Sequence, residues 1–401
     1  MNKGKRRERL KKILLLLNII GIILFLFLLV NNNKNTVNLH KENKVSERQR
    51  LLREELNQVQ SKVNHLEDER KGTFSFGFVT DSHYENGIGG LQQYFSLQNV
   101  SKNIPMRFIV HGGDLINGYK NKNQSLKDLN KMKQILSDTH LPVYLVKGNH
   151  DDNSYYVRDT QNSTTADMIT EKEWKENVDE LAENKLVRDE DNPLGAYYYK
   201  DINDVKVRII VLNSNDVPVI TTNSGKPKYY GINKYAFSNQ QLNWVANKAL
   251  NFSSKKNPSE WQTLFISHVP LYASMSLPND PPIVNSSVMD AIIQAFKNGN
   301  SIDIPERSDE FRHDFMHLNY EKQGKMNVIG YFAGHAHAEK SQVINGINYI
   351  TFLHALARTD GGPQRNTLMT TGAWSVVTIN TEKRTIYITG FGAATDRKYT
   401  Y

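Results

Sequence analysis

Aspartate, asparagine and histidine side chains recur at five places in the sequence where a short apolar run ends. The five places read Asp81-Ser82-His83, Gly112-Gly113-Asp114, Gly148-Asn149-His150-Asp151, Ser267-His268 and Gly334-His335-Ala336-His337. Mixed oxygen and imidazole ligands suit divalent ions such as Mn, Fe, Zn or Co better than Ca or Mg alone. Each motif by itself is more often a turn or a hydrogen-bonded edge residue. Five of them in succession predict a metal site.

The segments around these motifs alternate between strand-like and helix-like patterns. Strands are expected at Thr73–Thr80, Met106–Val110, Pro142–Val146, Val207–Leu212, Leu264–His268 and Val328–Ala333, and helices at Ser125–Leu136, Gln240–Leu250 and Ser287–Phe296. Consecutive strands are expected within residues 341–392, at Val343–Phe352, Trp374–Ile379 and Thr385–Thr389. This order predicts an α/β domain of two packed sheets with helices outside. Open α/β sheets place their sites at the carboxyl ends of strands, which is where the motifs fall.

The five motifs, in this order, resemble the signature of the calcineurin-like metallophosphoesterases, which reads D-x-H, G-D, G-N-H-D/E, H and G-H-x-H. The chain carries them as DSH, GGD, GNHD, SH and GHAH. The resemblance covers about residues 74–390 and indicates a membrane-anchored, bacterial-type member. It implies a four-layer α/β/β/α sandwich and a hydrolase that acts on a phosphomonoester or a phosphodiester.

The resemblance also implies a role for each motif residue. Asp81, His83 and His337 would bind one divalent ion, Asn149, His268 and His335 would bind a second, and Asp114 would bridge both. His150 matches the family's histidine near the phosphate. Asp151 matches the acidic residue that follows it and orients its neighbours.

Two cations about 3.5–4 Å apart can clamp the attacking and leaving oxygens of an in-line phosphoryl displacement. A water molecule between them would be present as hydroxide near neutral pH and would attack phosphorus. His150, when protonated, could give a proton to the leaving oxygen. No covalent enzyme intermediate is needed.

Other side chains that could approach a phosphate are expected to be packing or surface residues. They are His111, His354 and Arg358. Seven tyrosines could line a substrate cleft, although packing in the core or on an edge strand is the default expectation: Tyr155, Tyr156, Tyr197, Tyr198, Tyr199, Tyr229 and Tyr230. His313 and His317 stand four residues apart, which predicts a solvated helix face rather than a metal pair. Ser82 has no base in its motif, so a serine nucleophile is not expected. His40 and His65 are assigned no role.

The net charge of +8 would by itself suggest nucleic acid or an anionic membrane. Residues 1–12 hold seven cations and one anion, residues 13–33 none, and residues 34–72 nine cations and seven anions. This leaves 34 charges of each sign for residues 73–401. The neutral catalytic region argues against nucleic acid as a partner. With no cysteine, disulfides, thiolate metal sites and a cysteine nucleophile are excluded.

Residues 13–30 form an apolar run interrupted by Asn18 and Gly21. At about 1.5 Å per residue this run spans about 27 Å, close to the thickness of a bilayer's hydrocarbon core. We expect a signal anchor rather than a cleaved signal peptide, because Asn31-Asn32-Asn33 offers no small-residue cleavage site. The preceding cations predict a cytoplasmic tail at 1–12, so the catalytic domain would lie outside a single-pass cell-membrane anchor.

Residues 31–72 are expected to form a linker and a coiled-coil stalk. Val45, Leu52, Leu56, Val59, Val63 and Leu66 follow heptad spacing. This seam could pair two chains as a homodimer, while the alternatives are a lone amphipathic stalk or a helix packed on the globular domain. The catalytic domain is expected at 73–401, with 153–195 as an insertion or cap.

Two other functional readings stay open from the sequence. One is a non-catalytic, metal-binding surface module that keeps the fold, although no motif ligand is missing from this chain. The other is a nuclease of the same fold. The substrate would be an external phosphoester in any catalytic reading.

Overall fold

The computed structural model describes residues 50–51, 53–67, 71–85, 102–182, 186–355 and 372–401. By its internal contacts the chain divides into a unit at Met1–Glu54 and a unit at Glu55–Tyr401. The predicted tail at 1–12, the anchor at 13–30 and the first two seam residues, Val45 and Leu52, lie outside the described residues. Within the described residues, no helix has both the length and the apolar character needed to cross a membrane.

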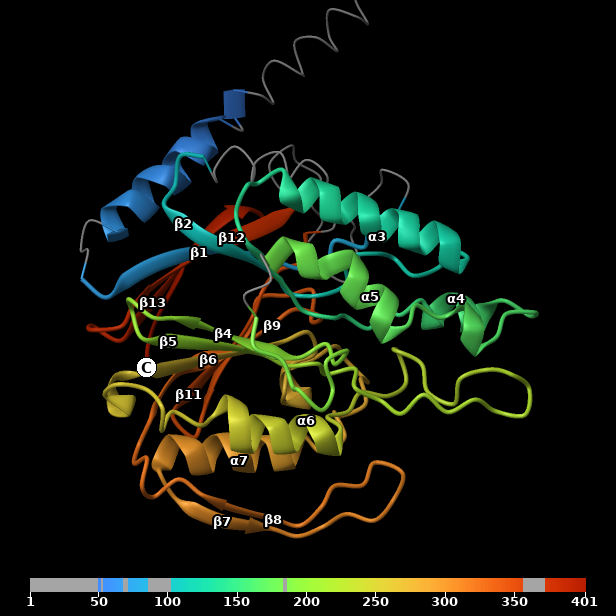
Figure 1. Cartoon of the computed structure of the whole chain (residues 1–401). Helices are drawn as coiled ribbons and strands as arrows, with labels where there is room; N and C mark the ends of the chain where they lie inside the picture. Colours follow the sequence, from blue (N-terminus) through green and yellow to red (C-terminus); the bar gives the residue numbers. More distant parts are fainter. Residues whose placement is uncertain (1–49, 52, 68–70, 86–101, 183–185, 356–371) are drawn as a thin grey trace, which may run out of the picture. The chain divides into compact units, whose positions relative to one another are not determined.

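Two six-stranded sheets form the centre of the second unit (Figure 1). The first has the order β14 (Arg397–Thr400), β13 (Thr385–Gly392), β12 (Ala373–Asn380), β1 (Thr73–Val79), β2 (Met106–His111) and β3 (Val143–Leu145). The second has the order β10 (Ser341–Ile344), β11 (Ile347–Thr351), β9 (Asn327–Ala333), β6 (Gln262–Ser267), β5 (Val207–Val211) and β4 (Tyr198–Ile202). A separate ribbon pairs β7 (Ser301–Ile304) with β8 (Met316–Asn319).

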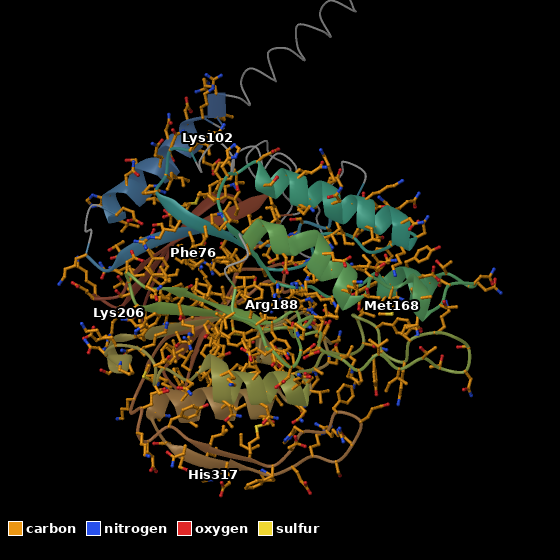
Figure 2. All side chains as sticks on the ribbon, in the orientation of Figure 1. Phe76, Lys102, Met168, Arg188, Lys206 and His317 are labelled. Carbon is orange, nitrogen blue, oxygen red and sulfur yellow. The ribbon has the colours of Figure 1, made fainter. Side chains whose placement is uncertain are left out.

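Apolar side chains from both sheets fill the space between them. Phe76 on β1 and Ile266 on β6 belong to this shared core and are fully buried. The side chain of Phe76 lies inside the sandwich, whereas His317 lies on the outer ribbon (Figure 2). The strands of the core are rich in aromatic and β-branched residues, which favour a pleated surface that is buried on both faces.

Helices cover the outer faces of the two sheets (Figure 1). On the first sheet lie α3 (Lys122–Ser137) and α5 (Glu171–Val178), and on the second lie α6 (Asn239–Trp244), the π-helical turn η3 (Val245–Ala249) and α7 (Ser286–Asn298). The remaining short helices are α4 (Ser154–Asp159), η1 (Thr165–Asp167), η2 (Asp179–Ala182), η4 (Pro258–Glu260) and η5 (Ala273–Met275). The arrangement of helices, sheet, sheet and helices agrees with the predicted four layers.

The parallel strands carry the five motifs to the same region of the sandwich. In the first sheet β1 pairs in parallel with β2, and β2 pairs in parallel with β3. In the second sheet β5, β6, β9 and β11 are parallel neighbours. Every motif follows the carboxyl end of one of these strands, so the loops meet although they are far apart in sequence.

The helical residues 55–67 belong to the second unit and pack on the rest of it. Val59 and Val63, two of the predicted seam residues, are buried. Glu55 accepts a hydrogen bond from the backbone N–H of Gly392, and Lys62 pairs with Asp396 at 2.7 Å. The described part of the stalk therefore matches the alternative of a helix packed on the globular domain, and these seam positions are occupied within one chain.

Candidate metal centre

The loop after β1 carries Asp81 and His83 in an unusual backbone conformation. Their φ angles are +54° and +42°, a region that residues with a β-carbon rarely adopt. The loop is held by backbone hydrogen bonds from Asp81 N to Gly113 O and from His83 N to Asp114 O. Such strain persists only where the surrounding structure over-determines the backbone, as at functional sites.

Three further motif residues share this conformation. Asp114 has a φ of +53°, His335 of +60° and His337 of +51°. The backbone N–H of His335 donates to both carboxylate oxygens of Asp81, at 3.0 and 3.2 Å. Two loops from different sheets are thus tied together at the residues that carry the predicted ligands.

Glycines let the loops approach each other closely. A Cβ on Gly148 would overlap the backbone nitrogen and Oδ1 of Asp114, and one on Gly113 would overlap the ring of His268. The glycines of the motifs therefore provide the space in which the ligand side chains meet.

The first group of converging side chains is Asp81, His83 and His337. Nε2 of His83 lies 3.3 Å from Nε2 of His337, which in turn lies 3.3 Å from Oδ1 of Asp81. Asp114 approaches the same group, with Oδ2 at 3.6 Å from Nε2 of His83. All four side chains are largely or fully removed from solvent.

The second group is Asp114, His268 and His335, with Asn149 beside it. Nε2 of His268 lies 3.2 Å from Oδ2 of Asp114 and 2.9 Å from Oδ1 of Asn149. Nδ1 of His335 lies 3.3 Å from Nε2 of His268. Because Oδ2 of Asp114 faces both groups, this carboxylate is the point at which they join.

The buried charges of the two groups compensate one another. Burial would raise the pKa values of Asp81 and Asp114, but the neighbouring histidines outweigh it and hold both below the usual range. Burial would lower the pKa of His268, but Asp114 outweighs it and raises that pKa to about 10. Burial dominates at His83 and His335 and lowers both pKa values. The metal-free site thus balances two carboxylates with protonated imidazole.

His150 stands at the edge of the clustered ligands. Its Nδ1–H donates to the carbonyl oxygen of Asn117 at 2.7 Å, and its ring stacks on Tyr155 with centroids 4.1 Å apart. Nε2 consequently faces the site, 3.9 Å from Oδ2 of Asp114. The ring is fixed on both sides while the side chain stays partly exposed.

Asp151 lies behind the ligands and binds the loop backbone. Its carboxylate accepts hydrogen bonds from the N–H groups of Asp114, Leu115, Ile116 and Gly148 at 2.8–3.3 Å. Burial, followed by the charge of Asp114, raises the pKa of Asp151 to about 7 despite these donors. Asp151 contacts the backbone that carries the ligands and belongs to neither ligand group.

Ser82 was expected to have no base nearby, but the structure places His111 beside it. Nε2 of His111 lies 2.8 Å from Oγ of Ser82, so a histidine is present where the sequence offered no base. The backbone N–H of Gly113 donates to Nδ1 of His111, which places the ring proton on Nε2. Burial lowers the pKa of His111 to about 3. The ring therefore donates to Ser82 and cannot take its proton.

The other weaker candidates occupy varied positions. The ring of His354 is buried and stacks on His337, with centroids 4.7 Å apart. The helix predicted for His313 and His317 is wrong. The backbone of His313 pairs with that of Arg307 in an isolated antiparallel β-bridge, and His317 is an exposed residue of strand β8. Arg358 and His40 lie outside the described residues, and His65 is exposed.

The seven tyrosines proposed as cleft residues lie in different surroundings. Tyr155 lies against His150, whereas Tyr197 and Tyr198 are core residues. Tyr156, Tyr199, Tyr229 and Tyr230 are partly buried. The segment 153–195 forms α4, η1, α5 and η2, and α4 supplies the tyrosine at the site.

Two residues of the site were missed by sequence reasoning. Asp280 accepts a 2.8 Å hydrogen bond from Nε2–H of His335, and the hydroxyl of Tyr235 lies 3.4 Å from the same nitrogen. Neither belongs to a motif or to a strand end, and they are 55 and 100 residues from His335. Only the tertiary structure brings them to the centre.

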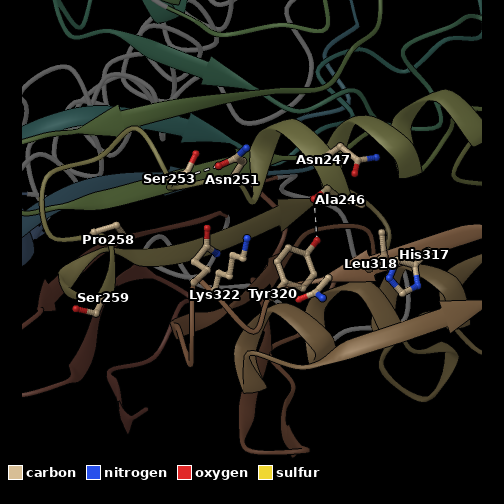
Figure 3. A pocket seen from close by; sticks show the side chains of 12 residues that line it. Ala246, Asn247, Asn251, Ser253, Pro258, Ser259, His317, Leu318, Tyr320 and Lys322 are labelled. Atoms are coloured by element: carbon tan, nitrogen blue, oxygen red, sulfur yellow. Dashed lines mark hydrogen bonds between the residues drawn. The ribbon is translucent and has the colours of Figure 1, made fainter.

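A cavity of about 570 Å³ lies elsewhere in the described structure (Figure 3). None of the predicted ligands lines it. The lining residues come from η3 and the segments after it and from the end of β8, and they include Asn247, Asn251, Ser253, His317, Tyr320 and Lys322. The hydroxyl of Tyr320 is bonded to the carbonyl oxygen of Ala246.

Comparison with solved structures finds distant similarities, and comparison with curated proteins finds no match. GAP50, the anchor in the inner membrane complex of Plasmodium, is 12% identical with a TM-score of 0.42, over 82% of this chain and 88% of that one. The TT1561 protein of Thermus thermophilus is 11% identical with a TM-score of 0.36, over 79% and 98%. A Vps29 mutant from Entamoeba histolytica is 9% identical with a TM-score of 0.31, over 82% and 99%. These similarities carry no inference about activity.

The family comparison is more informative. The model of the calcineurin-like phosphoesterase family matches residues 74–339, which is more than half of the chain and spans all five motifs. Together with the two ligand groups joined at Asp114, this match shows that the chain belongs to the calcineurin-like phosphoesterases.

Proposed function

We propose that this protein hydrolyses phosphomonoesters or phosphodiesters with two divalent metal ions. The observation that supports it most is the position of Asp114, whose Oδ2 lies 3.6 Å from Nε2 of His83 in one ligand group and 3.2 Å from Nε2 of His268 in the other. A single carboxylate shared by two groups suits a pair of adjacent cations.

The residues fit such ions by their chemistry and by their burial. In each group one atom per residue lies within 4.8 Å of all the others. Nε2 of His83 lies 3.3 Å from Nε2 of His337 in a partly buried position. Imidazole nitrogens with carboxylate and amide oxygens suit Mn, Fe, Zn or Co. Asp81, His83 and His337 would hold one ion, Asn149, His268 and His335 the other, and Asp114 both.

The ions would polarise the phosphoryl oxygens and acidify a water molecule. The protein's own groups would orient the substrate and move protons. His150 presents Nε2 towards the site because Nδ1–H is bonded to Asn117. In its protonated form it can donate the Nε2 proton to the leaving oxygen. Asp151 holds the backbone of Asp114 in place.

The cellular position is proposed from charge and hydropathy. We propose that residues 13–30 anchor the chain in the cell membrane, with 1–12 in the cytoplasm and 73–401 outside. Support comes from the seven cations before an uncharged run. Protease added to intact cells is expected to degrade 73–401, and protection of this region would contradict the proposal.

The function is tested with the purified full chain on a panel of phosphomonoesters and phosphodiesters. Turnover should need added Mn²⁺ and should be abolished by a chelator. Asp114→Asn should lower bound metal and turnover together. Asp204→Asn, an exposed partner of Arg107, is the matched control and should change neither. A chain that binds metal but turns over no ester on the panel would instead be a binding module.

A further inference from the structure

His335 has different surroundings at its two ring nitrogens. Nδ1 points to the ligand group and lies 3.3 Å from Nε2 of His268. Nε2 points the opposite way, to Oδ2 of Asp280 at 2.8 Å. Asp280 lies on the turn after η5 and belongs to none of the five motif loops.

The turn holds the carboxylate of Asp280 firmly. The hydroxyl of Ser276 and the backbone N–H of Leu277 both donate to Oδ2, at 2.5 and 3.0 Å. Lys340 donates to the carbonyl oxygen of Ser276 at 2.6 Å, which ties the turn to the segment that follows the GHAH motif. Three donors, including the ring N–H of His335, therefore meet at one oxygen of a side chain that is only 12% exposed.

An ionised carboxylate oxygen carries no proton, so Oδ2 of Asp280 can only accept a hydrogen bond from the imidazole of His335. The proton of a neutral His335 must then be on Nε2, and the lone pair must be on Nδ1, which faces the ligand group. A histidine that binds a metal ion through one nitrogen donates the proton of the other to a carboxylate, a backbone carbonyl or water, and a carboxylate both fixes the ring and raises its basicity.

We propose that Asp280 is a positioning residue that fixes the tautomer and the orientation of His335 so that Nδ1 is available to a metal ion. The proposal rests on the proposed metal-binding role of His335. It adds a loop outside the five motifs to the machinery of the site.

Tyr235 is the second neighbour of the same nitrogen, and its hydroxyl also donates a hydrogen bond to Asp280. Its hydroxyl lies 3.4 Å from Nε2 of His335, farther than the carboxylate and without its charge. Charged hydrogen bonds are shorter and about twice as strong as neutral ones. Asp280 should therefore dominate, and Tyr235→Phe serves as a matched variant in the same shell.

The first measurement is the histidine ¹⁵N–¹H spectrum of the metal-free full chain, in which the two tautomers have distinct nitrogen shifts. The His335 signal is assigned with His335→Gln. Wild type and Tyr235→Phe should show the proton on Nε2. Asp280→Ala should lose that preference. Asp280→Asn should retain it, because the donors Ser276 and Leu277 keep an amide oxygen at the Oδ2 position, and this variant guards against a general failure of folding.

The second measurement is the affinity for Mn²⁺ by calorimetry without substrate. Asp280→Ala should weaken the binding of one ion by about 10–100-fold, Asp280→Asn by less, and Tyr235→Phe by less than about threefold. An unchanged tautomer and unchanged affinity in Asp280→Ala would overturn the proposal. Lack of phosphoester turnover in the wild type would count against the phosphoesterase and not against Asp280, because neither measurement uses substrate.

Discussion

Nε2 of His268 lies 3.2 Å from Oδ2 of Asp114, and both side chains are fully buried. In the metal-free protein this is an ion pair, because Asp114 outweighs burial and raises the pKa of His268 to about 10. A proton therefore occupies the place that a cation would take. Metal binding must expel it, since only neutral imidazole binds a metal ion.

Proton release on metal binding is the first prediction. Calorimetry at pH 7 in buffers of different ionisation enthalpy should show that Mn²⁺ binding releases at least one proton. The apparent affinity of the affected site should rise by about tenfold per pH unit below pH 10. Binding heats that do not depend on the buffer would contradict the protonated state of His268.

The second prediction concerns the stability of the metal-free protein. The pKa of His268 is raised from 6.5 to about 10, so its stabilising contribution is complete below pH 6.5 and is lost as the pH rises towards 10. In excess chelator, the free energy of unfolding from urea titrations should fall between pH 6.5 and pH 10. Asp114→Asn should flatten this slope, and the exposed control Asp204→Asn should keep it. An equal slope in Asp114→Asn would show that the pH dependence comes from a group other than the His268–Asp114 pair.

The meeting of the five motifs could be predicted from the sequence because each motif lies at the end of a buried strand. Parallel pairing then brings these strand ends together, as for Asp81 after β1 and Asp114 after β2. Asp280 and Tyr235 could not be predicted in this way. They lie in irregular segments, and their proximity to His335 arises only from tertiary packing.

Spacing gave one wrong element, and in another element it could not identify what packs against the apolar face. The spacing of His313 and His317 fits a helix, but Met316 to Asn319 alternate buried and exposed positions, which is the period of a strand. The heptad positions Val59 and Val63 fit either a seam between chains or a helix packed on the globular domain, and the structure shows them buried within one chain. Periodicity shows which face of an element is apolar and does not show what covers that face.

Asp151 provides the third prediction. Its carboxylate accepts four backbone N–H groups, from Asp114, Leu115, Ile116 and Gly148. Asp151→Asn keeps the shape but replaces one acceptor oxygen with an N–H donor. Each buried donor left without an acceptor costs about 1–3 kcal/mol, so the variant should lose about 2–4 kcal/mol of unfolding free energy. Urea titration in chelator measures this loss. A loss below about 0.5 kcal/mol would show that the loop does not depend on this carboxylate.

The fourth prediction compares two glycine-to-alanine variants, one whose Cβ would overlap a proposed ligand and one whose Cβ would overlap nothing. A Cβ on Gly148 would overlap the backbone nitrogen and Oδ1 of Asp114. Gly148→Ala should therefore displace the shared ligand and weaken Mn²⁺ binding by at least about tenfold. The control is Gly324→Ala, whose Cβ would meet nothing within 4 Å, although its φ of +72° carries a small strain. It should cost about 1 kcal/mol of stability and leave metal affinity unchanged. Equal effects on affinity would refute the crowding argument.

The last prediction separates proton donation by His150 from a structural role. Nδ1–H of His150 is bonded to Asn117, so only Nε2 can reach a leaving oxygen. An alkyl leaving group needs that proton in the transition state, whereas nitrophenolate leaves without it. His150→Ala should lower kcat for an alkyl phosphate by about 100-fold or more, lower kcat for nitrophenyl phosphate far less, and keep the metal content of the wild type. An equal loss on both substrates would mean that His150 binds the phosphoryl group and does not donate the proton, because charge stabilisation does not depend on the leaving group's basicity.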